Sequence, residues 1–216
     1  MSPLIVKHKA KNQNCSVTRA GIGIPQSIVE KIAWPIGRTI EVGFIEKARC
    51  VLLRVLKEED EGFRFCYGDA RNRTGGRINC KAFIQNYLGT VVPLPKKRLE
   101  PIIIKDAHWG LYLFLEPLDW QMEEFSKSGV DKVGTGMVGL YELLGNKDIT
   151  LRVGQGIVRD RMNAHLKDQR FSPPTVRNFR YMLLDEEEDA KILERVLIAK
   201  YEEETGVLPR FQEIRA

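Results

Sequence analysis

Short apolar runs are spread unevenly along the 216 residues, and this unevenness constrains the fold more than any other feature of the sequence. Up to about residue 115 the runs are brief and β-rich, as in TIEVGF, CVLLRVL, FRFCY and GLYLFL, and Gly, Pro or charged turns separate them. Such spacing predicts a small all-β or α+β unit. After Pro117–Gly136 the pattern changes to two strands, a helix near Ile157–Lys167, a further strand and a long helix near Glu186–Glu204. We therefore predict an α+β protein with two domains, residues 1–120 and 121–216.

The composition is that of a globular protein, because 43% hydrophobic and 29% charged residues allow a buried core. No apolar run approaches the roughly 18–20 residues of a membrane span, and the N-terminus lacks the residue order of a signal peptide. We therefore expect a cytoplasmic protein without a membrane partner. The four cysteines are spaced 35, 16 and 14 residues apart without a CxxC pair, which favours reduced, mostly buried thiols over a zinc site.

Positive charge is concentrated in the first part of the chain. Residues 1–120 contain 19 Lys and Arg against 12 Asp and Glu, whereas residues 121–216 contain 15 against 17. A basic half is a weak indication of a polyanionic partner such as nucleic acid.

Two segments of the basic half share an order of features that is typical of an internal repeat. In residues 20–55 and in residues 75–115, a glycine and a short strand are followed by a short amphipathic helix, a Gly/Pro break and two strands. The sequence identity between the segments is low, so the order of features alone supports a repeat.

The first segment resembles the swapped-hairpin domain of AbrB-like DNA-binding regulators over about 40 residues. The resemblance is carried by RAGIGIP, SIVEKIAW, PIGRTIEV and VLLRV, whereas the second segment lacks the Ile-Pro pair. Arg38 follows the turn glycine Gly37, where the family often has Asp. If both copies exist, one chain forms internally the barrel that single-copy relatives form by dimerising.

This resemblance implies double-stranded DNA as a partner. Six basic residues are then candidate DNA contacts: Arg19, Arg38, Arg71, Arg73, Arg77 and Lys81. The alternative for each of them is a solvated basic surface, because phosphate contacts have no sequence signature of their own.

The stretch RVGQGIVRDRMNAH in the second half combines a strand end, two glycines and a helix. We predict that Gly154 and Gly156 turn the chain into the helix, whose free N–H groups favour an anion nearby. The helix is expected to bury Val158, Met162 and Leu166. Arg161 and His165 are i, i+4 neighbours beside that stripe. A guanidinium and an imidazole held together are suited to a phosphodiester, and the alternative is a surface arginine with a capping histidine.

Two further features of the second half need explanation. Gly139 lies inside an apolar strand, where glycine often marks the close approach of another group. Tyr141, two residues along, points to the same face, although an ordinary packed tyrosine is the alternative. Glu194 falls on the apolar stripe of the last helix. An unpaired buried carboxylate is costly, so a divalent metal or an arginine is expected beside it.

The order GLY, RVG, RMNAH, LERVLI and LPRFQ, from Val138 to Gln212, resembles the GIY-YIG nuclease superfamily. The resemblance implies a three-stranded antiparallel sheet between helices. It also implies DNA hydrolysis with one divalent cation, Mg²⁺ or another such as Mn²⁺, at each site.

The resemblance assigns a role to each matching residue. Tyr141 positions or deprotonates the attacking water, and Arg161 binds the scissile phosphate. His165 exchanges a proton with the tyrosine, and Glu194 is the metal ligand. Arg159 and Gln212 are further candidate DNA contacts.

Two residues depart from the family pattern. Arg152 stands where the second motif begins with Tyr, and it cannot act as a base at neutral pH because its pKa is too high. It either adds phosphate binding to the catalytic set or reports a lost activity. Gln212 stands where Asn is frequent, which is a mild change because Gln can still hydrogen-bond a phosphate.

The leading hypothesis is a sequence-specific DNA endonuclease of the Type II restriction kind. A double-strand cut usually needs two such sites, so we expect a homodimer, formed alone or on DNA. The alternatives are a non-catalytic DNA-binding regulator with a degenerate nuclease fold, and a repair or mobile-element nuclease.

Overall fold

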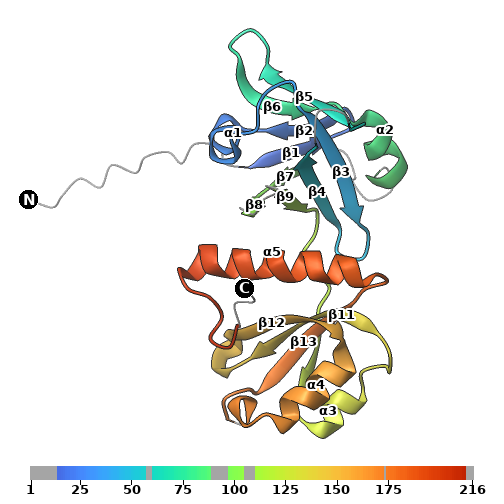
Figure 1. Cartoon of the computed structure of the whole chain (residues 1–216), viewed down its shortest axis with the longest axis vertical. Coiled ribbons are helices and arrows are strands. Elements are labelled where there is room, and N and C mark those ends of the chain that lie inside the picture. The colour runs from blue at the N-terminus through green and yellow to red at the C-terminus, as the bar shows by residue number, and fades with distance from the viewer. Residues whose placement is uncertain (1–13, 57–59, 89–96, 105–109, 173, 213–216) are drawn as a thin grey trace, which may run out of the picture. The chain divides into compact units, whose positions relative to one another are not determined.

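The computed structural model describes residues 14–56, 60–88, 97–104, 110–172 and 174–212. The protein is mixed α+β (Figure 1). It divides into a first unit, Met1–Phe44 with Cys50–Leu115, and a second unit, Ile45–Arg49 with Glu116–Ala216. None of the helices in the described residues is both long enough and apolar enough to cross a membrane.

The first unit is built mainly from short antiparallel strands. These are β1 (Cys15–Thr18), β2 (Gly21–Ile24), β3 (Thr39–Ile45), β4 (Cys50–Val55), β5 (Phe63–Asp69), β6 (Thr74–Ile78), β7 (Lys97–Leu99), β8 (Pro101–Ile104) and β9 (Gly110–Phe114). The helices are α1 (Gln26–Ile32), α2 (Lys81–Phe83) and the π-helix η1 (Ile84–Leu88). The strand order is β7-β1-β2-β6-β5-β3-β4-β9-β8. Only Glu100 separates β7 from β8, so the two ends of this order are joined through the chain and the strands form a ring.

The ring has an internal twofold relation. When β1, β2, β3 and β4 exchange places with β5, β6, β7–β8 and β9, every strand pairing maps onto another pairing. At its centre β2 pairs with β6, with Ile22 opposite Ile78 and Gly23 opposite Arg77. Each half also places its third strand against the first strand of the other half, because β3 pairs with β5 and β7 pairs with β1. The two halves are therefore interleaved rather than laid side by side.

The core of the first unit draws on both halves of the ring. Trp34 and Phe65 meet edge to face, with their ring centroids 6.0 Å apart, and both are buried. Cys15, Cys50 and Cys80 are buried, and all four cysteines are free, as predicted from their spacing. Burial raises the pKa of Cys15 to about 12 and that of Cys50 to about 12, so these thiols are unreactive at neutral pH.

The second unit has a four-stranded antiparallel sheet in the order β10-β13-β11-β12. Its elements are β10 (Gln121–Glu124), α3 (Lys127–Asp131), β11 (Val138–Leu144), the 3-10 helix η2 (Asn146–Asp148), β12 (Thr150–Ile157), α4 (Val158–Lys167), the 3-10 helix η3 (Gln169–Phe171), β13 (Asn178–Leu183) and α5 (Glu187–Thr205). Strand β10 and helix α3 occupy the stretch Pro117–Gly136, where no element was predicted. The reason is that β10 is a largely exposed edge strand of sequence QMEE, which has almost no apolar pattern.

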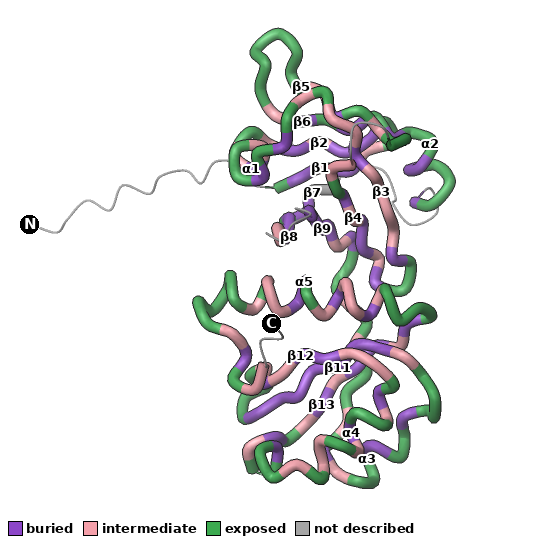
Figure 2. The backbone as a smooth tube through the Cα atoms, viewed as in Figure 1, coloured by how far each residue is buried: buried purple, intermediate pink, exposed green. Residues whose placement is uncertain are grey.

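Helices cover both faces of this sheet, with α3 and α4 on one side and α5 on the other (Figure 1). Helix α4 buries Val158 and Met162 as predicted, and Leu166 packs against the same core. Helix α5 buries Ala190, Leu193, Val196 and Leu197. Figure 2 shows that the middle strands β11 and β13 are mostly buried between these layers.

The prediction that Gly154 and Gly156 form a turn was wrong. Both lie within β12, which continues to Ile157, and α4 begins directly at Val158. Pairing with β11 keeps both in the sheet, since Gly154 lies opposite Tyr141 and Gly156 lies opposite Gly139. The N–H of Val158 donates to the carbonyl of Met137 at 3.1 Å, so the start of α4 is also tied to the sheet.

Candidate active site

Four elements of the second unit bring together the residues that the sequence assigned to catalysis. They are Tyr141 on β11, Arg152 on β12, Arg161 and His165 on α4, and Glu194 on α5. The charges of Arg152, Arg161 and Glu194 all influence the pKa of the Tyr141 hydroxyl, which places them around that group.

Tyr141 and His165 form the centre of this cluster. The Tyr141 hydroxyl oxygen and Nε2 of His165 are 2.8 Å apart, and the ring of His165 also packs edge to face against Phe171. Tyr141 is only 2% exposed. Burial raises the pKa of Tyr141, whereas burial and the charge of Arg152 lower the pKa of His165 to about 4. His165 is therefore a neutral imidazole at pH 7.

Arg152 lies within electrostatic range of the Tyr141 hydroxyl, and its charge lowers the pKa of that hydroxyl against the effect of burial. In the Tyr141–His165 pair the tyrosine donates to Nε2 when the ring proton of His165 is on Nδ1.

The C-terminal segment holds Arg152 in this position. Nη1 of Arg152 donates to the carbonyl of Phe211 at 2.7 Å, and the N–H of Phe211 donates to the carbonyl of Leu151 at 2.8 Å. Gln212, a predicted DNA contact, uses its side-chain oxygen to accept from the N–H of Val153 at 3.1 Å. The segment therefore covers part of the free edge of β12. Nε of Arg152 is buried and has no hydrogen-bond partner among the described residues.

Glycines of β11 and β12 leave space that neighbouring groups fill, among them two candidate site residues. A Cβ atom on Gly154 would lie 2.3 Å from Cζ and from the hydroxyl oxygen of Tyr141. A Cβ atom on Gly156, whose φ is +128°, would lie 2.9 Å from Nε of Arg161. A Cβ atom on Gly139 would lie 2.4 Å from the carbonyl oxygen of Met182. The close approach at Gly139 agrees with the expectation from the sequence. Gly154 and Gly156 were interpreted as a turn, and the alternating G-x-G in a strand was the signal that could have revealed their use.

Arg161 lines a cavity of about 360 Å³ next to this cluster. Apolar side chains such as Ile157 and polar ones such as Asp160 share its wall. Gln155 also lines it, and among the described residues its side-chain oxygen is buried without a hydrogen-bond partner. The cavity thus offers the guanidinium of Arg161 and the amide of Gln155 to a group that enters it. Sequence reasoning missed Gln155 because its position between two glycines carries no chemical motif.

Glu194 provides one carboxylate near Tyr141. Within the described residues there is no group of three or more His, Cys, Asp and Glu side chains that could hold a metal ion. Mg²⁺ is commonly held by one or two carboxylates together with waters and substrate phosphates, so a single glutamate beside a phosphate site suits it. Mn²⁺ accepts the same oxygen ligands.

Arg159, a predicted DNA contact, lies on α4 and is paired. Its Nη2 is 2.7 Å from the carboxylate of Asp131, which also binds Lys127 at 3.0 Å. The hydrogen bonds from Lys127 and Arg159 lower the pKa of Asp131. Arg159 thus connects α4 to α3 in this structure.

A second polar cluster lies on the opposite face of the same sheet. Glu142, the residue after Tyr141, is 4% exposed and accepts from Arg180 at 2.7 Å and from Thr150 at 2.9 Å. The guanidinium of Arg180 also lies 4.7 Å above the ring centroid of Trp120. Sequence analysis did not identify this cluster, because Glu142 follows the GLY motif without a pattern of its own.

The remaining predicted DNA contacts belong to the first unit. Arg38 is half-buried and donates to the carbonyl of Leu56 at 3.0 Å, so part of its function is to fix the end of β4. The other five are exposed at the surface: Arg19, Arg71, Arg73, Arg77 and Lys81. Comparison of the chain with protein-family models, with curated proteins and with solved structures found no match, so its function is inferred from its own residues.

Proposed function

We propose that the protein is a sequence-specific DNA endonuclease of the Type II restriction kind. In this proposal the second unit is a GIY-YIG nuclease domain and the first is an AbrB-like swapped-hairpin domain that binds double-stranded DNA. The observation that carries the proposal is the Tyr141 hydroxyl, which lies 2.8 Å from a neutral His165 and is flanked by Arg152, with Arg161 and Glu194 nearby.

The Tyr141–His165 pair provides a path for the proton of the attacking water. With the ring proton of His165 on Nδ1, the tyrosine oxygen can take a proton from water as it gives its own to Nε2 of the imidazole. The water oxygen forms a bond to phosphorus, and the bond from phosphorus to the leaving sugar oxygen breaks. Solvent returns a proton to that oxygen, and His165 later loses its proton to solvent.

Arg161 is the residue that grips the scissile phosphate. A guanidinium offers two parallel N–H groups to phosphate oxygens and stays charged at all relevant pH values. Gly156 leaves the space in which the Arg161 side chain lies, and the adjoining cavity of about 360 Å³ has room for the phosphate with its neighbouring sugar.

Glu194 is the residue that would hold the divalent cation, Mg²⁺ or Mn²⁺. When bound, the cation supplies Lewis-acid stabilisation of the phosphate and of the leaving oxygen. With one such site in each chain, cutting both strands calls for a homodimer, formed alone or on DNA.

Arg152 is the observation that favours the second candidate, a non-catalytic DNA-binding regulator. An arginine cannot replace tyrosine as a base. However, the proton path above runs from Tyr141 to His165 and needs no base at residue 152, where Arg152 adds positive charge near the Tyr141 hydroxyl. A separate DNA-binding unit argues against the third candidate, a structure-specific repair or mobile-element nuclease.

The test is incubation of the protein with a large defined DNA and Mg²⁺. We expect discrete fragments from the wild type and from the exposed control Glu202→Gln. Cleavage by Tyr141→Phe and by Glu194→Gln should be about 10²- to 10⁴-fold slower, the usual loss when a proton-transfer or charge-stabilising group is removed. Binding without cleavage in both Mg²⁺ and Mn²⁺ would establish the regulator instead. Fragments without a defined end sequence would contradict the restriction type.

A further inference from the structure

The hairpin formed by β5 and β6 is longer than its counterpart in the other half of the ring. Strands β1 and β2 are joined at once by Arg19 and Ala20. In contrast, β5 and β6 continue to pair beyond the last contact with β2, which is Ile24 opposite Gly76. Asp69 still lies opposite Thr74, where only the two strands of the hairpin remain. This tip, residues 67–74, therefore adds nothing to the closure of the ring.

The tip is exposed but locally well defined. All eight of its residues are exposed, including the ring of Tyr67 at 40%. The carboxylate of Asp69 accepts from the backbone N–H groups of Arg71 at 2.9 Å and of Asn72 at 3.2 Å, and from the side chain of Asn72. These bonds lower the pKa of Asp69 and close the turn. The tip is therefore exposed although hydrogen bonds close its turn.

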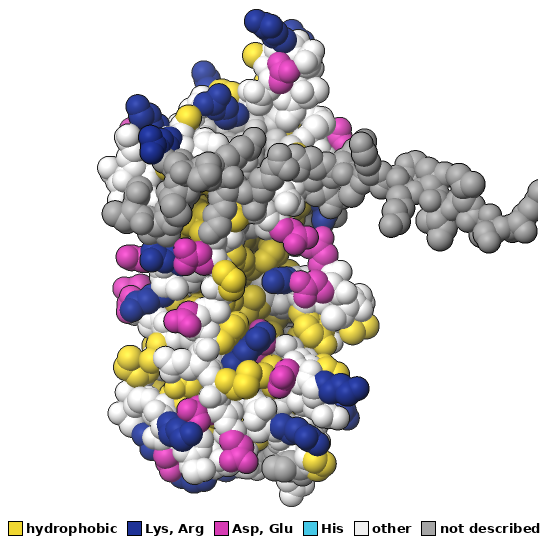
Figure 3. Space-filling model, turned by 180° about the vertical axis from the view of Figure 1, so that it is seen from behind, with side chains coloured by type: hydrophobic (Ala, Val, Ile, Leu, Met, Phe, Trp, Pro, Cys, Tyr) yellow, Lys and Arg dark blue, Asp and Glu magenta, His cyan; other side chains and the backbone are white. Residues whose placement is uncertain are grey.

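The tip carries positive charge outward. Arg71 and Arg73 lie in the turn between β5 and β6, and within the described residues neither takes part in an ion pair or a side-chain hydrogen bond. Figure 3 shows Lys and Arg side chains at the end of the projecting hairpin. The one carboxylate of the tip, on Asp69, is occupied by the turn.

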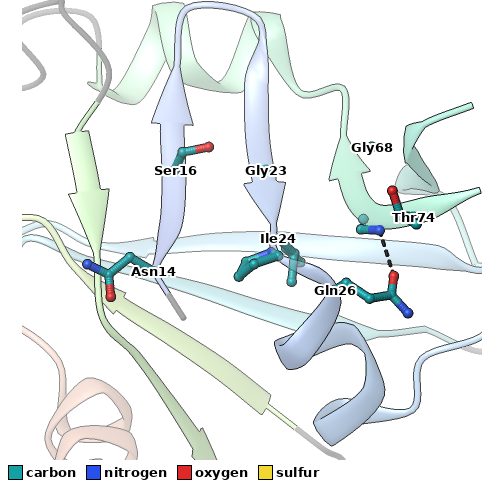
Figure 4. Close-up of a pocket in the computed structure, with 10 residues that line it drawn as sticks. Asn14, Ser16, Gly23, Ile24, Gln26, Gly68 and Thr74 are labelled. Atoms are coloured by element: carbon teal, nitrogen blue, oxygen red, sulfur yellow. Dashed lines mark hydrogen bonds between the residues drawn. The ribbon is translucent and has the colours of Figure 1, made fainter. Parts of the chain in front are cut away.

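Contacts at its foot orient the hairpin. The N–H of Gly75 donates to the side-chain oxygen of Gln26 at 2.7 Å (Figure 4). The side-chain nitrogen of Gln26 donates to Glu30 of α1 at 3.0 Å. Beside this contact is a cavity of about 320 Å³, lined by small or polar residues such as Ser16, Gly68 and Thr74. A sugar-phosphate strand can approach the backbone here, because glycines leave it uncovered.

We propose that the tip of the β5–β6 hairpin enters the major groove of double-stranded DNA, where Arg71 and Arg73 recognise guanine bases. This inference rests on the proposed function and names the element that reads the sequence. The major groove is about 12 Å wide and admits a two-stranded ribbon, whereas the minor groove is about 6 Å wide. Arginine paired with O6 and N7 of guanine is the most frequent specific contact in that groove.

Selection from a library of duplexes with a randomised 20-base-pair centre tests the proposal, with binding measured without divalent metal so that no cleavage occurs. We expect the wild type to select a defined sequence that contains guanine. Arg71→Gln and Arg73→Gln should each lose preference at particular guanine positions, by about 10- to 100-fold in relative affinity. The control Lys200→Gln removes one exposed positive charge from α5 and should select the wild-type sequence.

A second variant replaces Asp69–Thr74 by the two-residue turn Asn-Gly, in imitation of the β1–β2 connection. It should remain folded, as thermal unfolding would show, and should keep weak DNA binding with reduced selectivity. If the arginine variants and the short hairpin select the wild-type sequence with undiminished preference, the hairpin does not read bases, while the nuclease proposal stands. An equal loss of affinity for all sequences would reduce the arginines to phosphate contacts and overturn the reading role. If the wild type selects no sequence, the sequence specificity of the proposed function itself fails.

Discussion

Tyr141 and Glu142 are neighbours on β11, yet they organise polar clusters of opposite character on the two faces of the sheet. The carboxylate of Glu142 accepts from both Arg180 and Thr150 through Oε2, and the guanidinium lies over the ring of Trp120. Around Tyr141 the pairing is incomplete, because Nε of Arg152 has no hydrogen-bond partner in the described structure. Glycines also replace side chains beside Tyr141.

The completeness of hydrogen bonding therefore distinguishes a structural polar cluster from a candidate catalytic one. A buried polar network that satisfies every member makes one arrangement unique. A half-buried arginine such as Arg152, whose buried Nε has no partner among the described residues, leaves a hydrogen bond to be made by something else. Substitutions in the first kind of cluster should lower the stability of the protein, and substitutions in the second kind should lower its activity.

The largest effect should come from filling the space beside Tyr141. In Gly154→Ala the new Cβ would fall 2.3 Å from the tyrosine ring and hydroxyl, so the ring must move. We expect cleavage to fall about 100-fold, because a displacement near 1 Å is enough for such a loss. Initial rates on a defined DNA measure this. Gly43→Ala is the control, since its Cβ would meet Leu52 at an ordinary 3.7 Å. Wild-type rates for Gly154→Ala would show that the ring position is not important for catalysis.

The opposite face should respond in stability rather than in rate. Arg180→Met leaves the carboxylate of Glu142 buried without its ion pair, and we expect the free energy of unfolding to fall by roughly 2–3 kcal/mol. This figure allows for the exposure of the Arg180 side chain, which is 32%. Urea unfolding measures the change, and the double variant Glu142→Leu/Arg180→Met should recover much of it. If Arg180→Met were as stable as the wild type but cleaved DNA more slowly, the contrast between the two clusters would be reversed.

The smallest effect concerns the protonation of His165. The ordinary pKa of histidine is near 6.5, whereas that of His165 in the folded protein is about 4. Between these values the unfolded chain binds a proton that the folded protein does not, so stability is lost as the pH falls from 6.5 towards 4. We expect a loss of roughly 2 kcal/mol, reduced to allow for the partial exposure of the ring. Urea unfolding at pH 7 and pH 4.5 measures it. His165→Gln should show a smaller pH dependence, and identical pH dependences would contradict the neutral, buried imidazole.

Local patterns were sufficient for the elements that have strong periodicity. The boundaries of α4 and α5 agree with the prediction to within one residue, because apolar residues recur along both helices with helical spacing. The pattern failed for β10, whose residues are largely exposed. It also failed at Gly154 and Gly156, where glycine was interpreted as a turn signal although the ladder with β11 keeps both residues in the strand.

The sequence alone predicted the mixed α+β class, the helices α4 and α5, and the set of residues from which a site could be made. These follow from spacing and side-chain chemistry, which act over a few residues. Only the tertiary structure decided that Arg152 approaches Tyr141 while a carbonyl 59 residues further along the chain holds it. It also decided that Arg159 pairs with Asp131 and that Glu142 is buried beside Arg180. The physical reason is that such contacts depend on strand register and helix packing between distant segments, for which a single sequence has no local signal.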